Sequence, residues 1–515
     1  MMEACDNSDR RRDRRREEDR AERGEGGGSD SGGGEGRYNA ASDEQQPLLS
    51  SSSASSTSGS PRTPSQVYAV SLAFFVLFLA YNSLQNYTTS LLPNGLGNQS
   101  LAILYISVPF FCFTGPPIVQ RLGEKWTMVL GSSTYILFMG SLIKVIPALV
   151  KAASVVIGFG AAILWIAVGP YITKASTTDT VGRNNGIFWG IFQFSNVIGN
   201  IGAYFIFDNL GGSTALFLAL TAIGGLAVII FCFIKPTSKF STQYHHQNSE
   251  ALLEEKRTVW EDVKATLVIL QTNEMLLLLY MFLFTGLELA FWSGEFPQLL
   301  DASVIGLVLC FAGVGEIAGS LFTNRLSDRL GCSLMLGVGA VVYAAGLTLV
   351  SFIHLDPPGT RPLWKGASWM AYVSAFAFGV GDSCLNTQVY ALLGKLTKGA
   401  TAVKAFTVFQ IFQNLGSALG FFLGTQLPMH GHNASLAQVY IQALILLIGT
   451  VFFIRVDVQH SRKTKRRQQQ EQQEQAAREA KSTDSHHHGH HHHHHHHDHD
   501  HHHHVGVNRA NGMHA

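Results

Sequence analysis

Carboxylates inside apolar stretches are the residues of this sequence whose type and position could do chemistry. Three stretches long enough to cross a bilayer contain Asp382, Glu288, Glu295 and Glu316. A carboxylate at membrane depth costs a few kcal/mol or more, so it rarely faces lipid. Asp382 and Glu288 lie deepest in their stretches, and we expect both to face a wet cavity between helices. A carboxylate in such a place tends to hold a proton, so this pattern predicts coupling to proton movement.

Side-chain amides accompany these acids on neighbouring helical faces. They are Asn386, one turn after Asp382, and Gln193, Asn196, Gln413 and Asn414 in two further apolar stretches. Such amides either line the same cavity or hydrogen-bond one helix to another, a contact that contributes about 1 kcal/mol. Glu316 stands among small residues that favour close helix packing, so it could equally be structural. Glu295 could simply reach the outer interface of the membrane.

Membrane-spanning helices must position these side chains. Of the 515 residues 46% are hydrophobic and 14% are charged, but the apolar residues concentrate between about 66 and 456. Twelve stretches of about 20 apolar residues can be counted there, which predicts an all-α membrane protein with two six-helix halves and disordered termini. The predicted divisions are a cytosolic tail (1–65), a first half (66–235), a cytosolic linker with an amphipathic helix (236–273), a second half (274–456) and a basic, Gln- and His-rich cytosolic tail (457–515).

The charges of the short loops predict the orientation. Lys and Arg gather in the linker and in the loops on the side of the termini, as expected of a cytosolic face. Both termini are therefore predicted to lie in the cytosol. The glycosylation acceptors Asn98 and Asn433 fall in loops on the opposite side, where a glycan can be attached.

An internal repeat relates the two halves. Ile191-Phe-Gln193 in the fifth stretch matches Ile411-Phe-Gln413 in the eleventh. A cytosolic gate motif of the major facilitator transporters follows the eighth stretch, and it consists of Gly319, Asp328, Arg329 and Gly331. Its counterpart in the first half, residues 121–125, lacks the leading Asp, which predicts a weaker gate there. In such transporters the binding site lies between the matching halves at mid-membrane.

Four segments resemble one branch of this superfamily, the Unc ninety-three (uncoordinated-type) proteins. They are Ala80-Tyr-Asn-Ser-Leu-Gln-Asn86, Gly182-Arg-Asn-Asn-Gly-Ile-Phe-Trp189, Thr285-Gly-Leu-Glu288 and Gly381-Asp-Ser-Cys-Leu-Asn-Thr-Gln388. The resemblance covers residues from about 66 to 456 and implies the facilitator fold. It also implies the roles of the best-known members, which regulate potassium channels or escort innate immune receptors. The chain is more similar to the orphan animal and plant members, whose substrates are not settled.

Both tails carry short patterns of their own. Glu44-Gln-Gln-Pro-Leu48-Leu49 fits the acidic dileucine motif that sorting adaptors bind, and it would direct the protein to endolysosomal compartments. Residues 461–467 are basic, which suits an anchor at the cytosolic face or contact with anionic lipid. A His-rich run that includes His486, His490 and His499 could bind a divalent metal weakly, although it lacks the fixed geometry of a firm metal site.

The function remains open between several hypotheses. The sequence holds no nucleophile elbow, phosphate loop or metalloprotease motif, so we expect neither an enzyme nor a cofactor. The first hypothesis is a regulator or escort of an ion channel (potassium type) or receptor. The second is a proton-coupled transporter of a small solute, and the third is divalent-metal transport or sensing through the His-rich tail. The expected partners are the lipid bilayer, a channel or receptor subunit and a sorting adaptor, but no nucleic acid. The expected location is the endolysosomal or vacuolar membrane, or the plasma membrane.

Overall fold

The computed structural model describes residues 65–177, 180–239, 259–355, 363–364, 367–397, 400–429 and 436–491. Three predicted features lie outside these ranges, namely the dileucine motif Glu44–Leu49, the acceptor Asn433 and His499. The side chains of Asp328, His486 and His490 are also outside the description.

The first half of the chain folds into six long helices. They are α2 (Ser65–Leu91), α3 (Leu96–Cys112), α4 (Gly115–Ser141), α5 (Pro147–Lys174), α6 (Val181–Asn209) and α7 (Gly212–Phe233), with short 3₁₀ turns η1 (Pro93–Gly95) and η2 (Thr237–Lys239). Proline opens several of these elements at the first or second position, where its missing N–H costs no helical hydrogen bond.

The second half repeats this arrangement. Its long helices are α11 (Asn273–Ala290), α12 (Ile305–Leu330), α13 (Cys332–Leu355), α14 (Trp369–Leu396), α15 (Ala400–Gln426) and α16 (Ala437–His491). A π-helical turn η3 (Phe291–Glu295) and a 3₁₀ turn η4 (Phe296–Leu299) extend α11. The short helix α10 (Val259–Leu270) precedes it, in the region where the sequence predicts an amphipathic helix.

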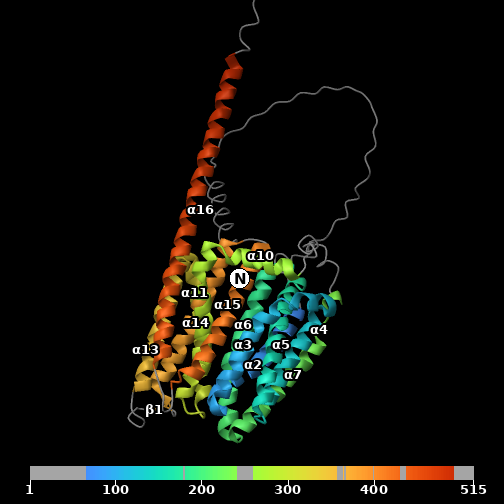
Figure 1. The fold of residues 1–515 in the computed structure, drawn as a ribbon. Helices are drawn as coiled ribbons and strands as arrows, with labels where there is room; N and C mark the ends of the chain where they lie inside the picture. Colours follow the sequence, from blue (N-terminus) through green and yellow to red (C-terminus); the bar gives the residue numbers. More distant parts are fainter. Residues whose placement is uncertain are drawn as a thin grey trace, which may run out of the picture. The chain divides into compact units, whose positions relative to one another are not determined.

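The described residues are nearly all helical, as predicted, but they include a small strand pair. Strands β1 (Leu363–Trp364) and β2 (Ala367–Ser368) form an antiparallel hairpin between α13 and α14. This hairpin lies at one end of the helix bundle and α10 lies at the other, so we refer to the β1 side and the α10 side (Figure 1).

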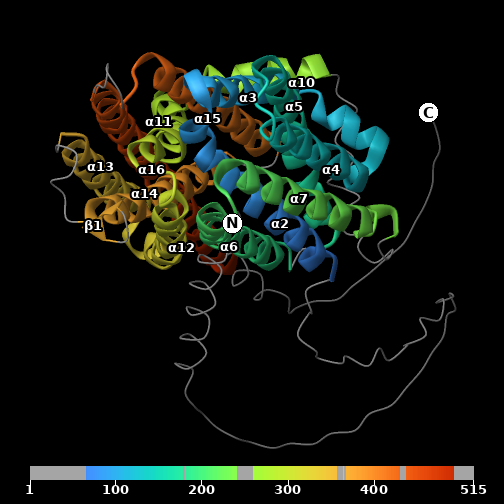
Figure 2. The ribbon, with the colours of Figure 1, turned by 90° about the horizontal axis from the view of Figure 1, so that it is seen from below.

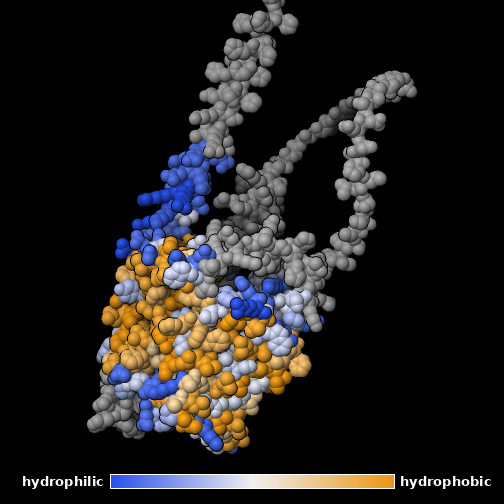
Figure 3. Space-filling view, turned by 45° about the vertical axis from the view of Figure 1, so that its right-hand side comes forward, coloured by the Kyte–Doolittle hydropathy of each residue, from blue (hydrophilic) through white to orange (hydrophobic). Residues whose placement is uncertain are grey.

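Nine helices of the described residues are long and apolar enough to cross a membrane. Three further long helices, α4, α6 and α14, lie at the other predicted positions, but they are less apolar than these nine. That all twelve cross the membrane therefore stays a prediction. Apolar side chains cover most of the face shown in Figure 3, which suits contact with lipid.

The helices of each half pack together, and the halves meet along two helix pairs. Figure 2 shows α4, α5 and α7 grouped apart from α11, α13 and α14. The principal contacts between the halves are those of α6 with α12 and of α3 with α15. Within the second half, a Cβ on Gly286 would lie 1.9 Å from the Gln413 carbonyl oxygen, and one on Gly379 would lie 1.9 Å from that of Ala312. These glycines therefore allow α11 and α15, and α12 and α14, to pack backbone against backbone.

The chain divides into two compact units, and the boundary falls between Asp457 and Val458 within α16. The helix continues to His491, beyond residue 457, where the sequence predicts the cytosolic tail to begin. Gln, Glu, Lys, Arg and Ala dominate residues 461–480, and these residues have high helix propensity, so the helix that begins at Ala437 does not end there.

Candidate functional site

Asp382 and Glu288 approach each other from α14 and α11, and one amide bridges them. The Asn386 amide nitrogen lies 3.2 Å from Asp382 Oδ1 and 3.3 Å from Glu288 Oε1. Gln413 of α15 donates to Asn386 Oδ1 at 3.0 Å and so orients the bridging amide. Glu288 is fully buried, while Asp382 keeps part of its surface accessible. The structure thus brings together four of the side chains that the sequence singled out.

Three polar atoms around these carboxylates have no hydrogen-bond partner in the described part of the chain. They are Glu288 Oε2, Trp292 Nε1 and Tyr343 Oη, all on buried side chains. The Trp292 indole faces Asp382, and the Tyr343 hydroxyl lies within electrostatic range of both acids. Sequence reasoning did not single out Tyr343, because a tyrosine in an apolar stretch carries no local signal of its neighbours.

Glu316 joins the two halves rather than only packing within its own. Asn196 of α6 donates to both carboxylate oxygens, at 3.2 and 3.1 Å. Asn200, one turn further along α6, donates to the Asn196 carbonyl and accepts from Asn86 of α2. A chain of amides therefore runs from α2 through α6 to Glu316, which lies close enough to Asp382 to interact with it electrostatically.

Glu295 closes the β1 side of the interface between the halves. It ends the π-helical turn η3, is completely buried and accepts three amide donors. Asn98 of α3 and Gln298 donate to Oε1 at 2.8 and 3.0 Å, and Gln438 of α16 donates to Oε2 at 3.0 Å. A π-helical turn inserts one extra residue and re-aims the following side chains, and such turns are frequent at functional sites. Glu295 therefore lies buried between the halves, and not at the outer membrane interface as the alternative prediction had it.

The Asn98 amide therefore makes a hydrogen bond inside the protein. Its side chain is 3% exposed and bonded to Glu295, whereas a glycosylated amide must reach solvent. Gly424 of α15 packs over the pair, since a Cβ there would lie 1.9 Å from Glu295 Oε1. The geometry is against the predicted glycan at Asn98.

Further hydrogen bonds join the halves on the same side. Gln85 donates to Ser293 Oγ at 3.1 Å, and Thr89 donates to the Gly294 carbonyl at 2.7 Å. The backbone N–H of Gly306 donates to the Tyr87 hydroxyl at 3.0 Å. Together with Asn98–Glu295 these contacts form what we call the β1-side seam. It lies between the acid pair and the β1 end of the bundle.

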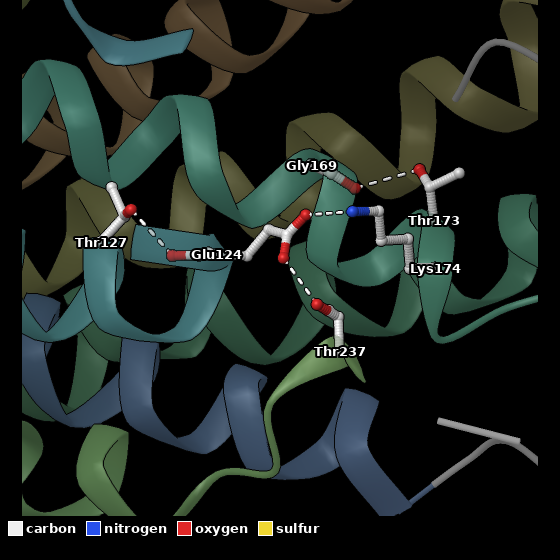
Figure 4. A network of polar contacts seen from close by, with 7 residues as sticks. Glu124, Thr127, Gly169, Thr173, Lys174 and Thr237 are labelled. Carbon is white, nitrogen blue, oxygen red and sulfur yellow. Dashed lines mark hydrogen bonds and ion pairs between the residues drawn. The ribbon is translucent and has the colours of Figure 1, made fainter. Parts of the chain in front are cut away.

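The α10 side carries a different polar network, which lies within the first half (Figure 4). Glu124 of α4 pairs with Lys174 at the end of α5 and accepts the Thr237 hydroxyl of η2 at 2.6 Å. Gly123 directly before it has φ +76°, a conformation that glycine adopts without strain. Burial alone would raise the pKa of Glu124, but the hydrogen bonds from Lys174 and Thr237 outweigh it and hold the pKa below its ordinary value of 4.5.

The second half has a related arrangement at the matching positions. Gly331 has φ +87°, close to that of Gly123, and Cys332 stands where the first half has Glu124. Lys395 at the end of α14 lies 2.9 Å from Cys332 Sγ, as Lys174 at the end of α5 meets Glu124. The first half therefore has an ion pair at these positions, and that its gate is weaker stays a prediction.

The remaining predicted residues lie apart from the acid pair. Arg329 is exposed, and Gly319 allows α12 to approach α14, since a Cβ would lie 2.9 Å from the Val380 carbonyl oxygen. Asn414 donates to Gln410 of its own helix at 2.7 Å. Gln193 is half-buried on α6. Within the described ranges no group of His, Cys, Asp and Glu could hold a metal ion, and the His-rich run lies largely beyond them.

Comparison with known proteins identifies the family. Residues 72–454 match the family described as ion channel regulatory protein UNC-93. The chain belongs to the UNC-93 family. The UNC93-like protein MFSD11 of Xenopus tropicalis is 28% identical over 438 residues, 78% of this chain and 97% of that protein. UNC93-like protein 3 of Arabidopsis thaliana is 28% identical over 391 residues, and the human protein unc-93 homolog A is 26% identical over 460 residues. The predicted family is thereby confirmed.

Solved structures confirm the facilitator type of fold. A POT family transporter in complex with 5-aminolevulinic acid superposes with a TM-score of 0.57 at 12% identity, covering 78% of this chain and 96% of that one. A D-xylose-proton symporter superposes with a TM-score of 0.57 at 14% identity, covering 75% and 97%. These likenesses show the fold. The family and the described helices that are long and apolar enough to cross a membrane support an integral membrane protein. The family description names ion channel regulation, and the solved structures that share the fold are transporters.

Proposed function

We propose that this UNC-93 family protein is a secondary transporter of a small solute whose conformational cycle is coupled to protons. The observation that carries the proposal is the buried pair of carboxylates, Glu288 and Asp382, in stretches of α11 and α14 that contain no compensating cation. Residues 275–324 and 370–394 include neither Lys nor Arg. Two adjacent carboxylates without a cation repel each other strongly at low dielectric, so one of them favours the protonated form.

A shared proton also accounts for the unpartnered oxygen of the pair. Glu288 Oε2 has no hydrogen-bond donor in the described chain, and a proton on that oxygen would turn it into a donor toward Asp382. Loss of the proton would leave a second negative charge that only a solute or a new proton could neutralise. Such a group couples proton binding to solute binding.

The seam supports an alternating-access cycle. It closes the β1 side, while α5 and α14 do not pack extensively against the opposite half in the described ranges. In the orientation that we propose, with both termini in the cytosol, the acid pair would be reached from the cytosolic side. Rocking of the halves would open the seam and expose the pair to the other side.

The test uses full-length protein in proteoliposomes supplied with a metabolite extract, with the proton gradient imposed first inward and then outward. A solute carried with the proton accumulates under the inward gradient, and a solute exchanged for the proton accumulates under the outward one. Mass spectrometry of the vesicle contents identifies any solute that accumulates. We expect accumulation that collapses with a protonophore, is lost in Asp382→Asn and Glu288→Gln, and persists in Asp301→Asn, a control acid that is exposed. No accumulated solute, or equal accumulation in all variants, would exclude the proposal.

Regulation or escort of a channel or receptor is the second candidate, and the family description favours it. Mild-detergent purification from native membranes with quantitative mass spectrometry tests it. A channel or receptor recovered in near-equal amount supports this role, and a protein that purifies alone speaks against it.

The remaining proposals concern the tails. Replacing Leu48 and Leu49 by Ala should move the protein from endolysosomal membranes to the plasma membrane if an adaptor binds Glu44–Leu49. Deletion of residues 486–504 followed by growth under metal stress tests metal handling, and unchanged growth would remove it.

A further inference from the structure

The Tyr343 hydroxyl lies near Asp382 without a hydrogen-bond partner in the described chain, and a ligand bound to Asp382 could supply one. Glu288 Oε2, Trp292 Nε1 and Tyr343 Oη belong to side chains that are no more than 5% exposed. A buried polar atom without a partner carries a free-energy penalty. Contact with Asp382 relieves it at Trp292 Nε1 and a shared proton relieves it at Glu288 Oε2, so the penalty remains mainly at Tyr343 Oη. A ligand that reaches Asp382 would offset part of this penalty.

The charge of the surroundings selects the class of ligand. Glu288, Asp382 and Glu316 converge from three helices, and the opposing helices of the first half lack cations as well. No Lys or Arg occurs in residues 65–91, 152–173 or 184–209. An anion would meet only like charge here, whereas a cation would pair with the carboxylates.

Aromatic rings surround the same spot. Tyr343 packs against Phe378 with ring centroids 4.9 Å apart and against Phe284 at 5.4 Å, and Trp292 lies between Glu288 and Glu295 along the helix. The faces of Trp and Tyr attract an organic cation through the negative charge density of the ring. Since the described residues hold no group that suits a metal ion, the aromatic faces favour an organic cation.

The first half has an aromatic cluster that begins near the depth of Glu288 and extends toward the α10 side. Gln85 of α2 contacts Ser293 in the β1-side seam. One helical turn closer to the α10 side, α2 carries Tyr81 and α11 carries Leu289, the neighbour of Glu288. Tyr81 adjoins Phe78, at 6.0 Å between ring centroids. Trp165 and Trp189 stack at 5.8 Å close to Phe78, and Trp189 is 42% exposed although it lies within a long helix.

We propose that the acid–aromatic cluster of Glu288, Trp292, Tyr343 and Asp382 binds a small organic ammonium ion. The ammonium group hydrogen-bonds the carboxylates, and its apolar body lies against the aromatic rings of both halves. This inference rests on the proposed transport function and names its substrate class. Because the ammonium and the shared proton neutralise the same carboxylates, the two compete, and the protein exchanges one for the other.

The test compares three probes with one phenyl body and different charge, which are 2-phenylethylammonium, 2-phenylethanol and phenylacetate. Binding to the full-length protein in detergent is measured by calorimetry at pH 7. We expect saturable binding of the ammonium at least tenfold tighter than that of either other probe. Asp382→Asn should weaken it at least tenfold, and Tyr343→Phe, which keeps the ring, should weaken it by less. The control Asp301→Asn should bind as the unaltered protein does, and gel filtration establishes that each variant is folded.

A second measurement distinguishes failure of the ammonium proposal from failure of the transport proposal. Proton release on adding the ammonium, read with a pH dye in weak buffer, should be about one per protein and absent in Asp382→Asn. Equal or tighter binding of the neutral or anionic probe, or no binding of any probe, would overturn the ammonium class. If in that case proton-driven solute accumulation persists in vesicles, the transport proposal stands with another substrate class. If accumulation is also absent, both fail.

Discussion

Removal of the Asn98 side chain should loosen the β1-side seam by an amount that the structure allows to be estimated. Asn98→Ala removes one of the two donors to Glu295 Oε1, and this donor is the one that comes from the other half. A hydrogen bond to a charged group contributes about 1.5–3 kcal/mol, so opening of the seam should become roughly ten- to a hundredfold more frequent. Hydrogen–deuterium exchange reports such openings as faster exchange of the amides that they expose.

Gln298→Ala is the matched control for this experiment. It removes the other donor to the same carboxylate oxygen, but from within the second half. We expect Asn98→Ala to speed exchange in η4 and at the first turn of α3 together, and Gln298→Ala to affect η4 alone. If the two variants change α3 equally, or if neither does, the Asn98–Glu295 contact does not hold the halves together and the reasoning is refuted.

Four further outcomes are expected. Ser100→Ala destroys the glycosylation acceptor but keeps the Asn98 amide, so it should leave gel mobility unchanged, and a downward shift would reveal a glycan there. Glu124→Gln should lower the free energy of unfolding by about 1–3 kcal/mol in detergent, and a cycle with Lys174→Met should show that the two effects are coupled. Because the folded-state pKa of Glu124 lies below 4.5, its contribution should be constant above that pH and be lost as the pH falls further, which denaturation from pH 7 to 3 measures. Gly424→Ala should mimic Asn98→Ala in the exchange experiment, because the added methyl group would collide with Glu295.

The sequence predicted the parts of this protein that depend on local composition. Apolar stretches placed the long helices, and the cost of a carboxylate in lipid selected Asp382 and Glu288 as partners in one site. The contact of Asn386 with Asp382 follows from its place one turn later, whereas its contact with Glu288, 98 positions away, does not. These inferences need only the period of a helix and the energy of a buried charge.

Contacts between distant segments could not be predicted in this way. Asn98 looked like a glycosylation acceptor because its local pattern is a sequon, while its partner Glu295 is 197 positions away. The π-helical turn that aims Glu295 inward has no compositional signature. Lys174 and Lys395 did carry a signal, since both follow the last apolar turn of equivalent helices, but only the repeat alignment reveals it.

The distribution of polar contacts explains why the halves can move as bodies. On the α10 side the Glu124–Lys174 pair and the Cys332–Lys395 contact each lie within one half, so they stiffen a half without tying it to the other. The bonds of the β1-side seam and the Asn196–Glu316 contact cross between the halves, and two of them end on carboxylates. Three neutral bonds and two bonds to carboxylates together stabilise the closed seam by roughly 5–10 kcal/mol, before the cost of ordering these side chains is subtracted. A shift of a two-state equilibrium from 1:99 to 99:1 takes about 5.5 kcal/mol, so binding of a proton or a solute at Glu288 and Asp382 is of the right size to open or close the seam.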